Sequence, residues 1–174
     1  MVRCRECAGR RLAFASARAA VEYDEAVKAV VAGWKEYGLR TLAAPAADLV
    51  VAIVERPKVD ALVAVPADAD RGLRRGHNPA ASLAAELGRR WELPAEPLLG
   101  RSRSVPRQRG LSRVERRRNV AGAFVALKPV PATVAVVDDV YTSGATAAAT
   151  AAALRRAGAR RVEIVTLARV IRGR

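Results

Sequence analysis

Apolar residues in the first half of the chain recur at two spacings, one typical of strands and one typical of helices. Residues 17–23 predict an edge strand. Asp24 is a helix-capping residue, and it precedes apolar side chains at helical spacing that end at Trp34. A second amphipathic helix is predicted over residues 39–54. Residues 60–66 form a short apolar run ending in proline, which indicates a buried parallel strand followed by a loop.

The second half of the chain continues the alternation of helices and strands. The pattern predicts a helix over residues 78–91, a short strand over 94–99, a buried strand over 132–140, an alanine-rich helix over 145–157 that ends at Gly158, and a third buried strand over 162–168. Strand–helix–strand units with right-handed crossovers give a parallel sheet. We therefore expect one α/β domain over residues 17–174, behind a short basic leader at residues 1–16.

The composition fits a soluble single domain. The chain has 174 residues, enough for a core sheet with helices on both faces, and 51% of them are hydrophobic. Aromatic residues make up 4% of the sequence, so alanine, valine and leucine must build the core. No apolar run is long enough to span a bilayer, and residues 1–11 lack the apolar stretch of a signal peptide. A cytoplasmic protein is expected.

The formal charge of +14 indicates an anionic partner. Nucleic acid, phosphate-bearing metabolites and acidic protein surfaces all fit this charge. Arginine dominates over lysine and alanine is abundant, a pattern that high genomic GC content also produces, so charge alone leaves nucleic-acid contact open. Residues 100–119 hold eight arginines against one glutamate, which indicates either a functional loop or a disordered segment.

Residues 134–146 combine a strand, two acids, a hydroxyl-rich turn and the start of a helix. Asp138 and Asp139 come at the carboxyl end of the strand, where ligands of open α/β sheets bind. The turn leads directly into the helix, so backbone N–H groups and the helix N-terminus can hold a phosphate. The residues of the predicted phosphate site are Thr142, Ser143, Gly144, Ala145 and Thr146. No Walker A and no G-x-G-x-x-G sequence occurs, which argues against an ATPase and a dinucleotide-binding protein.

Two carboxylates beside a phosphate site fit a sugar phosphate, because the acids can accept hydrogen bonds from two ribose hydroxyls. This segment closely resembles the motif with which type I phosphoribosyltransferases bind phosphoribosyl pyrophosphate (PRPP). The resemblance implies their fold, a central, mainly parallel sheet of about five strands flanked by helices. It also implies catalytic roles for Asp138 and Asp139 and a 5-phosphate site in the turn. The alternative is an ordinary strand-to-helix turn with a capping threonine.

Two further blocks extend the resemblance over most of the chain. One is Val65-Pro66, followed by Arg71 and by Arg-Gly-His-Asn at residues 75–78. The other, residues 103–124, contains Gln-x-x-Leu, then an arginine, and ends in Asn-Val-Ala-Gly-Ala-Phe. Together with the PRPP motif, these blocks are similar to the ComF family of competence-associated, phosphoribosyltransferase-like proteins.

The chain departs from the family pattern near the first block. His77 and Pro79 stand where the family usually has phenylalanine and glutamine, and Asp68 stands where a histidine is frequent. Asp68 and Asp70 are unfavourable neighbours for pyrophosphate, so the departures leave catalytic turnover open. His77 is either a general base or, as we expect, a loop residue near a helix start.

The resemblance assigns arginines to two loops around the ligand. The pyrophosphate loop would contain Arg71, Arg74 and Arg75. The flexible loop that closes over the substrate would contain Arg107, Arg109, Arg113 and Arg116. Mg²⁺ is implied as a cofactor that bridges diphosphate oxygens and ribose hydroxyls. The alternative ligand for these arginines is the backbone of single-stranded DNA.

Cys4 and Cys7 form a C-x-x-C pair with no second pair in the sequence. Structural zinc needs four ligands, and ComF proteins often carry a four-cysteine zinc site ahead of the main fold. The pair resembles half of such a site, so zinc is not expected here.

The resemblance implies a ComF-like protein that binds PRPP or a related ribose 5-phosphate, with phosphoribosyl transfer as its chemistry and DNA uptake in natural transformation as its setting. The alternative is a non-catalytic basic module that binds single-stranded DNA or a competence helicase. A base-salvage enzyme is a third reading, and no base pocket is recognisable for it.

Overall fold

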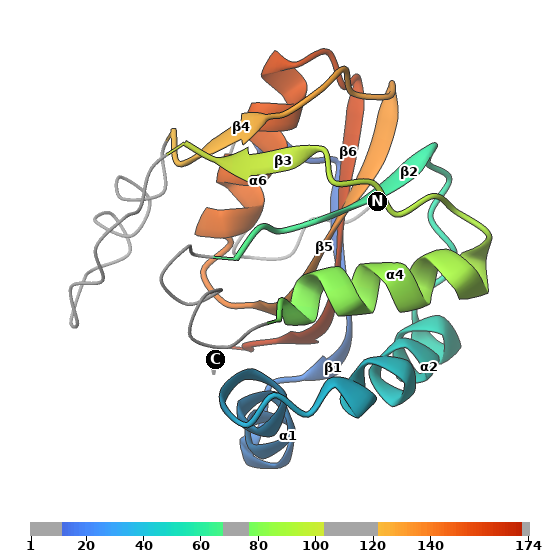
Figure 1. The fold of residues 1–174 in the computed structure, drawn as a ribbon, viewed down its shortest axis with the longest axis vertical. Coiled ribbons are helices and arrows are strands. Elements are labelled where there is room, and N and C mark those ends of the chain that lie inside the picture. Colours follow the sequence, from blue (N-terminus) through green and yellow to red (C-terminus); the bar gives the residue numbers. More distant parts are fainter. Residues whose placement is uncertain (1–11, 68–76, 103–121, 172–174) are drawn as a thin grey trace.

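In the part of the chain that the structure describes, four parallel strands form the central sheet. A computed structural model describes residues 12–67, 77–102 and 122–171. Across the sheet the strands lie in the order β1 (Ser16–Glu22), β6 (Arg161–Arg169), β5 (Thr133–Tyr141) and β2 (Ala61–Ala64) (Figure 1). Each neighbouring pair is parallel. The predicted α/β class and parallel sheet are confirmed, with four strands in the described sheet where about five were expected. This architecture is consistent with a type I phosphoribosyltransferase-like fold.

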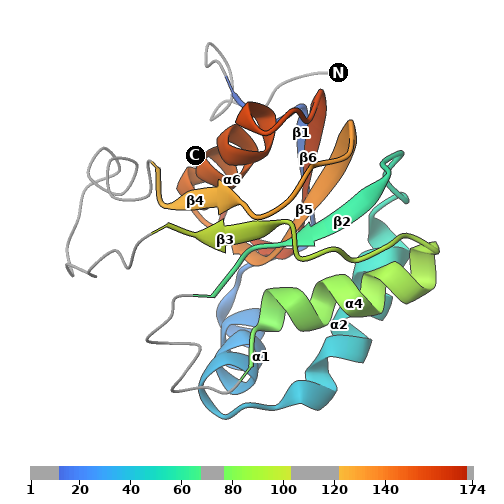
Figure 2. The ribbon, with the colours of Figure 1, turned by 45° about the horizontal axis from the view of Figure 1, so that its top comes forward.

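Helices cover both faces of the sheet, as Figures 1 and 2 show. One face carries α1 (Glu25–Glu36), α2 (Ala43–Ile53) and α4 (Pro79–Trp91). The opposite face carries α6 (Ala145–Arg156). A small antiparallel sheet packs beside α6, and it consists of β3 (Leu99–Arg101) and β4 (Phe124–Ala126). No helix of the described residues is long and apolar enough to cross a membrane.

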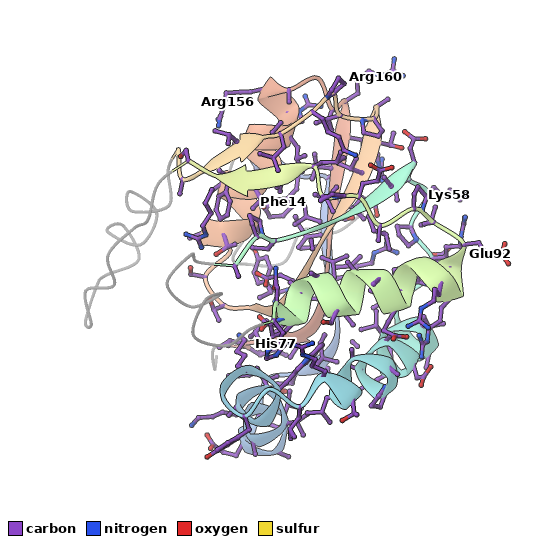
Figure 3. All side chains as sticks on the ribbon, viewed as in Figure 1. Phe14, Lys58, His77, Glu92, Arg156 and Arg160 are labelled. Atoms are coloured by element: carbon purple, nitrogen blue, oxygen red, sulfur yellow. The ribbon has the colours of Figure 1, made fainter. Side chains whose placement is uncertain are left out.

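Each face of the sheet has its own apolar core. On the α6 face, Val134 and Val136 of β5 pack with Leu154 and with Phe14, which Figure 3 labels. On the other face, Ala135 and Val137 pack with the cluster that includes Trp34 of α1, Leu87 of α4 and Val50 of α2. Alternate residues of β5 thus serve opposite cores, as the two-residue period of a strand requires. The same alternation governs the acids that follow.

The predicted cap of α1 at Asp24 is present, and α4 also begins with a capping residue, Asn78. The Asp24 carboxylate accepts a hydrogen bond from the Val27 amide at 2.8 Å, and the Asn78 side chain accepts one from Ala80 at 3.1 Å. Both residues have extended backbone and precede the first helical turn, which is the geometry of an N-cap.

Two predicted elements differ from the structure. The helix expected over residues 39–54 is a 3₁₀ turn (η1, Arg40–Leu42) followed by α2, and Pro45 falls in the first turn of α2, where its missing N–H is tolerated. The strand expected over residues 94–99 makes only one bridge to the central sheet, at Ala95. Prolines at 94 and 97 remove ladder donors, so regular pairing starts again only with β3.

Candidate functional site

The carboxyl end of β5 and the first turn of α6 form an open pocket. Its lining includes Asp138, Thr142, Gly144 and Thr146 from the predicted PRPP motif, and Val65 from the end of β2. Thr166 of β6 completes this side and pairs with Asp138 in the sheet register. The structure therefore brings the predicted turn and one of the two predicted acids to one pocket at the carboxyl edge of a parallel sheet, where ligands of such sheets bind.

Backbone amides are available in the turn between β5 and α6. The first regular helical bond runs from the Ala148 amide to the Gly144 carbonyl at 2.9 Å, so earlier amides have no intrahelical partner. Ala145 makes a long bond of 3.4 Å to the Ser143 hydroxyl, and among the described residues the amides of 142–144 and 146 make none. Open amides at a helix N-terminus favour an anion.

Gly144 has a backbone that only glycine adopts easily. Its φ is +73°, and a Cβ at this position would lie 2.8 Å from Cζ of Tyr141 and closer still to the hydroxyl. Tyr141 therefore packs directly against the turn, and the Arg169 guanidinium lies 5.4 Å from the centre of its ring. The missing side chain allows the turn to close against an aromatic ring.

Asp138 is a half-buried carboxyl that faces the pocket. Burial and the charge of Asp139 together raise its pKa to about 8, although the Lys35 ammonium opposes the shift. One Asp138 oxygen accepts a hydrogen bond from the Asp139 amide at 3.0 Å. A carboxyl in this setting gains from a ligand that supplies hydroxyl donors or a cation.

Asp139 points away from the pocket. Its residue is 7% exposed, and its Oδ2 lies 2.5 Å from Nζ of Lys35, which belongs to the last turn of α1. Its Oδ1 accepts a hydrogen bond from the Val140 amide at 2.7 Å. The two acids thus lie on opposite faces of the sheet, Asp138 with α6 and Asp139 with α1. The catalytic role expected for both stays a prediction.

The ends of the two predicted loops meet beside the pocket. Asn78 donates a hydrogen bond to the Val65 carbonyl at 2.9 Å, which holds together the two described ends that flank residues 68–76. Arg101 precedes the other loop, and its Nε donates to the Pro66 carbonyl at 3.4 Å. Its guanidinium also lies 4.9 Å from the ring centre of Phe124, on the strand that follows that loop. Residues flanking both loops are therefore in contact.

Several predicted site residues lie outside the described part of the chain. They are the pyrophosphate-loop residues Arg71, Arg74 and Arg75, the flexible-loop residues Arg107, Arg109, Arg113 and Arg116, and the cysteines Cys4 and Cys7. Their assignments stay predictions.

His77 lies directly before the N-cap of α4, as Figure 3 shows. Its Nε2 contacts the Trp34 carbonyl at 2.8 Å. This contact connects the start of α4 with the end of α1. The position of His77 therefore fits the expected loop residue near a helix start. The residue does not line the pocket at Asp138.

The sequence did not indicate the ion pair of Lys35 with Asp139, nor the hydrogen bond from Asn78 to the Val65 carbonyl. Lysine is scarce in this arginine-rich chain, and a basic residue in the last turn of a helix ordinarily signals only a favourable interaction with the helix dipole. Asn78 was recognised as part of a family block, but its bond to Val65 depends on the return of the chain to the sheet edge.

Comparisons with known proteins identify relatives over part of the chain. No family model matches it. It is 36% identical to competence protein F of Haemophilus influenzae over 115 residues, which cover 63% of this chain and 50% of that protein. It is also 36% identical to DNA utilization protein YhgH of Escherichia coli over 117 residues, 64% of this chain and 50% of that protein. The chain spans about half the length of these curated relatives.

A solved structure from Thermus thermophilus aligns with 78% of this chain and 84% of its own, at 18% identity and a TM-score of 0.39.

Proposed function

Because the chain is a ComF-family protein over the part that it shares with its curated relatives, we propose that it binds PRPP or a related ribose 5-phosphate in the pocket between β5 and α6. We further propose that it acts in DNA uptake during natural transformation, in the cytoplasm; the names competence protein F and DNA utilization protein YhgH support the link to DNA. The observation that carries the ligand proposal is the pairing of open turn amides with the pocket-facing carboxyl of Asp138.

The proposed ligand fits the pocket in two parts. The 5-phosphate accepts hydrogen bonds from the amides of residues 142–146 and from the hydroxyls of Thr142 and Thr146, which both line the pocket. The ribose hydroxyls donate to Asp138. The diphosphate would lie toward Val65, which lines the pocket shortly before the segment in which the resemblance places the pyrophosphate-binding arginines.

Mg²⁺ is proposed as a companion of the diphosphate. Among the described residues no group of three histidine, cysteine or acidic side chains could hold a metal. The Asp138 carboxylate in the pocket supplies a hard oxygen ligand of the kind that Mg²⁺ prefers. When bound, the ion would neutralise charge on the diphosphate, and Asp138 would contact it or the ribose hydroxyls.

Phosphoribosyl transfer is the reaction that we propose for such a complex. The bond between ribose C1 and the diphosphate oxygen breaks, diphosphate leaves with the electron pair, and an acceptor nucleophile forms a new bond to C1. Positive charge develops on the ribose ring during this displacement. An ionised Asp138 would stabilise that charge, and the turn would hold the ring by its phosphate.

Isothermal titration calorimetry tests the ligand. Wild-type protein should bind PRPP with Mg²⁺, and Asp138→Asn should weaken binding by about a hundredfold, because hydrogen bonds to a charged group are lost. Asp24→Asn is a suitable control, since it keeps a capping side chain on α1 away from the pocket. Equal affinities for wild type and Asp138→Asn, or no binding by either, would refute the proposal.

A second candidate function is single-stranded DNA binding without catalysis. The formal charge of +14 favours it, and so does the similarity to DNA utilization protein YhgH. Affinity for an oligonucleotide should then fall steeply with salt. Reversing charges among residues 101–118 should reduce that slope, whereas a slope unchanged by the reversal would place the contact elsewhere.

A further inference from the structure

The acidic doublet of β5 is divided between two faces of the sheet. Asp138 lines the pocket on the α6 side, and Asp139 is paired with Lys35 on the α1 side. In a strand, consecutive side chains point to opposite faces, so one ordinary strand cannot present both carboxylates to one ligand from the same side. The register of β5 with β6 keeps the same offset on either side of Asp139, from Asp138 opposite Thr166 to Val140 opposite Ala168, so no residue is inserted at this point.

The pair between Asp139 and Lys35 is largely removed from solvent. The side chains are 10% and 29% exposed, and the two charged atoms are 2.5 Å apart. The neighbouring Trp34 is fully buried in the core on this face, and its carbonyl contacts His77. These contacts hold the last turn of α1 in place, so the ammonium of Lys35 has a fixed position against β5.

The second oxygen of Asp139 connects the pair to the pocket. Oδ1 accepts the Val140 amide at 2.7 Å, and Val140 itself lines the pocket two residues before Thr142. A carboxylate held on one side by an ammonium and bonded on the other to a main-chain amide fixes the backbone between Asp138 and the phosphate turn.

We propose that Lys35 and Asp139 are positioning residues, with Lys35 acting through Asp139, so that Asp138 alone of the two acids contacts the ligand. Lys35 keeps the Asp139 carboxylate on the α1 face, and Asp139 orients the main chain from which Asp138 and the turn project. The identity of the ligand rests on the proposed function, but the pair and its effect on the backbone do not.

Ligand affinity gives the first test. Asp138→Asn should lose about a hundredfold in PRPP affinity. Lys35→Met and Asp139→Asn should each lose about tenfold, the usual range for a residue that orients a ligand-contacting group. The double variant should lose no more than either single variant, because both break one interaction. Lys35→Arg should restore affinity to within about threefold of wild type, since it keeps the charge.

Amide hydrogen exchange without ligand gives the second test. The Val140 amide should exchange slowly in wild type and in Lys35→Arg, and faster in Lys35→Met and Asp139→Asn. If wild type binds no ribose phosphate, the proposed function fails, and this exchange still decides the positioning role. Additive affinity losses, unchanged Val140 exchange in Lys35→Met, or a loss in Asp139→Asn that equals that in Asp138→Asn would overturn the inference.

Discussion

Asp138 carries an ionisable group where the fold disfavours its charge. Its carboxyl is half-buried and lies beside a second acid, and both effects raise its pKa more than the Lys35 ammonium and the hydrogen bond from the Asp139 amide lower it. A side chain chosen for stability alone would be neutral here. The acid is therefore retained at a cost to the folded state, which is characteristic of groups that contact a ligand.

Replacing Asp138 by asparagine should stabilise the ligand-free protein in a pH-dependent way. The folded protein keeps the proton up to about pH 8, whereas the unfolded chain releases it near the ordinary value of 3.8. Unfolding thus releases a proton between these values, and rising pH favours the unfolded state. The gain in unfolding free energy from Asp138→Asn should be small near pH 4 and reach about 1–3 kcal/mol at pH 8. Thermal denaturation at several pH values measures it.

Asp139→Asn is the matched control for that experiment. It removes the partner of a partly buried ammonium, so it should lower the melting temperature at pH 8 instead of raising it. A gain for both variants, or a gain for Asp138→Asn that does not grow with pH, would contradict the assignment of the pKa shift to Asp138.

Gly144→Ala should damage the turn through two separate effects. The φ of +73° costs an L-residue about 1 kcal/mol, and the new Cβ would collide with Tyr141. We expect a total loss of about 2–4 kcal/mol in unfolding free energy and a loss of PRPP affinity. Gly122→Ala is a matched control, because Gly122 has the same φ and no atom of the described residues lies within 4 Å of its Cβ position. Urea denaturation should show the smaller loss there, and equal losses would exclude the collision.

At the scale of elements, periodicity and caps predicted most of the described secondary structure. The strand over 132–140 and the helix over 145–157 correspond to β5 and α6 within one residue at each end, because their apolar positions have a clear period. The secondary structure of residues 94–99 could not be predicted from periodicity and caps. Its strand preference competes with two prolines, and its one bridge depends on Leu62, which is remote in sequence.

Asn78 joins two elements, so its substitutions can be separated. Asn78→Ser keeps a capping oxygen for α4 but is too short to replace the bond to the Val65 carbonyl, and Asn78→Ala loses both. Asn78→Ala should cost about 1–2 kcal/mol in unfolding free energy and Asn78→Ser less, while both weaken PRPP binding. Calorimetry and thermal denaturation measure the two effects.

Asp24→Ala provides the comparison, because it removes the cap of α1 and no bond near the pocket. It should cost about 1 kcal/mol without changing affinity. If Asn78→Ser bound PRPP as tightly as wild type, the bond to Val65 would have no part in shaping the pocket.

At the scale of the molecule, the two cores share the central strands and should melt together. Leu154 of α6 belongs to the core on one face of the sheet. Leu87 of α4 belongs to the core on the other face, which also contains both tryptophans, Trp34 and Trp91. Leu154→Ala should cost about 2–5 kcal/mol, and tryptophan fluorescence should report the same midpoint as circular dichroism. Leu87→Ala, in the core that contains the tryptophans, should show a similar loss and the same coincidence of the two midpoints. Separate midpoints in Leu154→Ala would show that the faces unfold independently.

The site could be predicted only where it is continuous in sequence. The strand, the acids and the turn lie within residues 134–146, so their order predicted a phosphate pocket, and the structure brings most of them to one pocket. Lys35 reaches the doublet from a helix about a hundred residues earlier, and only the packing of α1 against the sheet creates that contact. The face on which each acid lies likewise depends on the register of the assembled sheet.

Because Asp138 and Asp139 face opposite sides of β5, a change in the length of this strand would affect its carboxylates and its apolar residues differently. Inserting a single residue early in β5 would exchange the faces of the acids, turning Asp139 toward the α6 side and Asp138 toward the α1 side, so each face would still hold one carboxylate. The same insertion would also send each valine and alanine of the strand into the wrong core. Length changes in this strand are therefore opposed by its hydrophobic residues and not by the carboxylates that a ligand would contact.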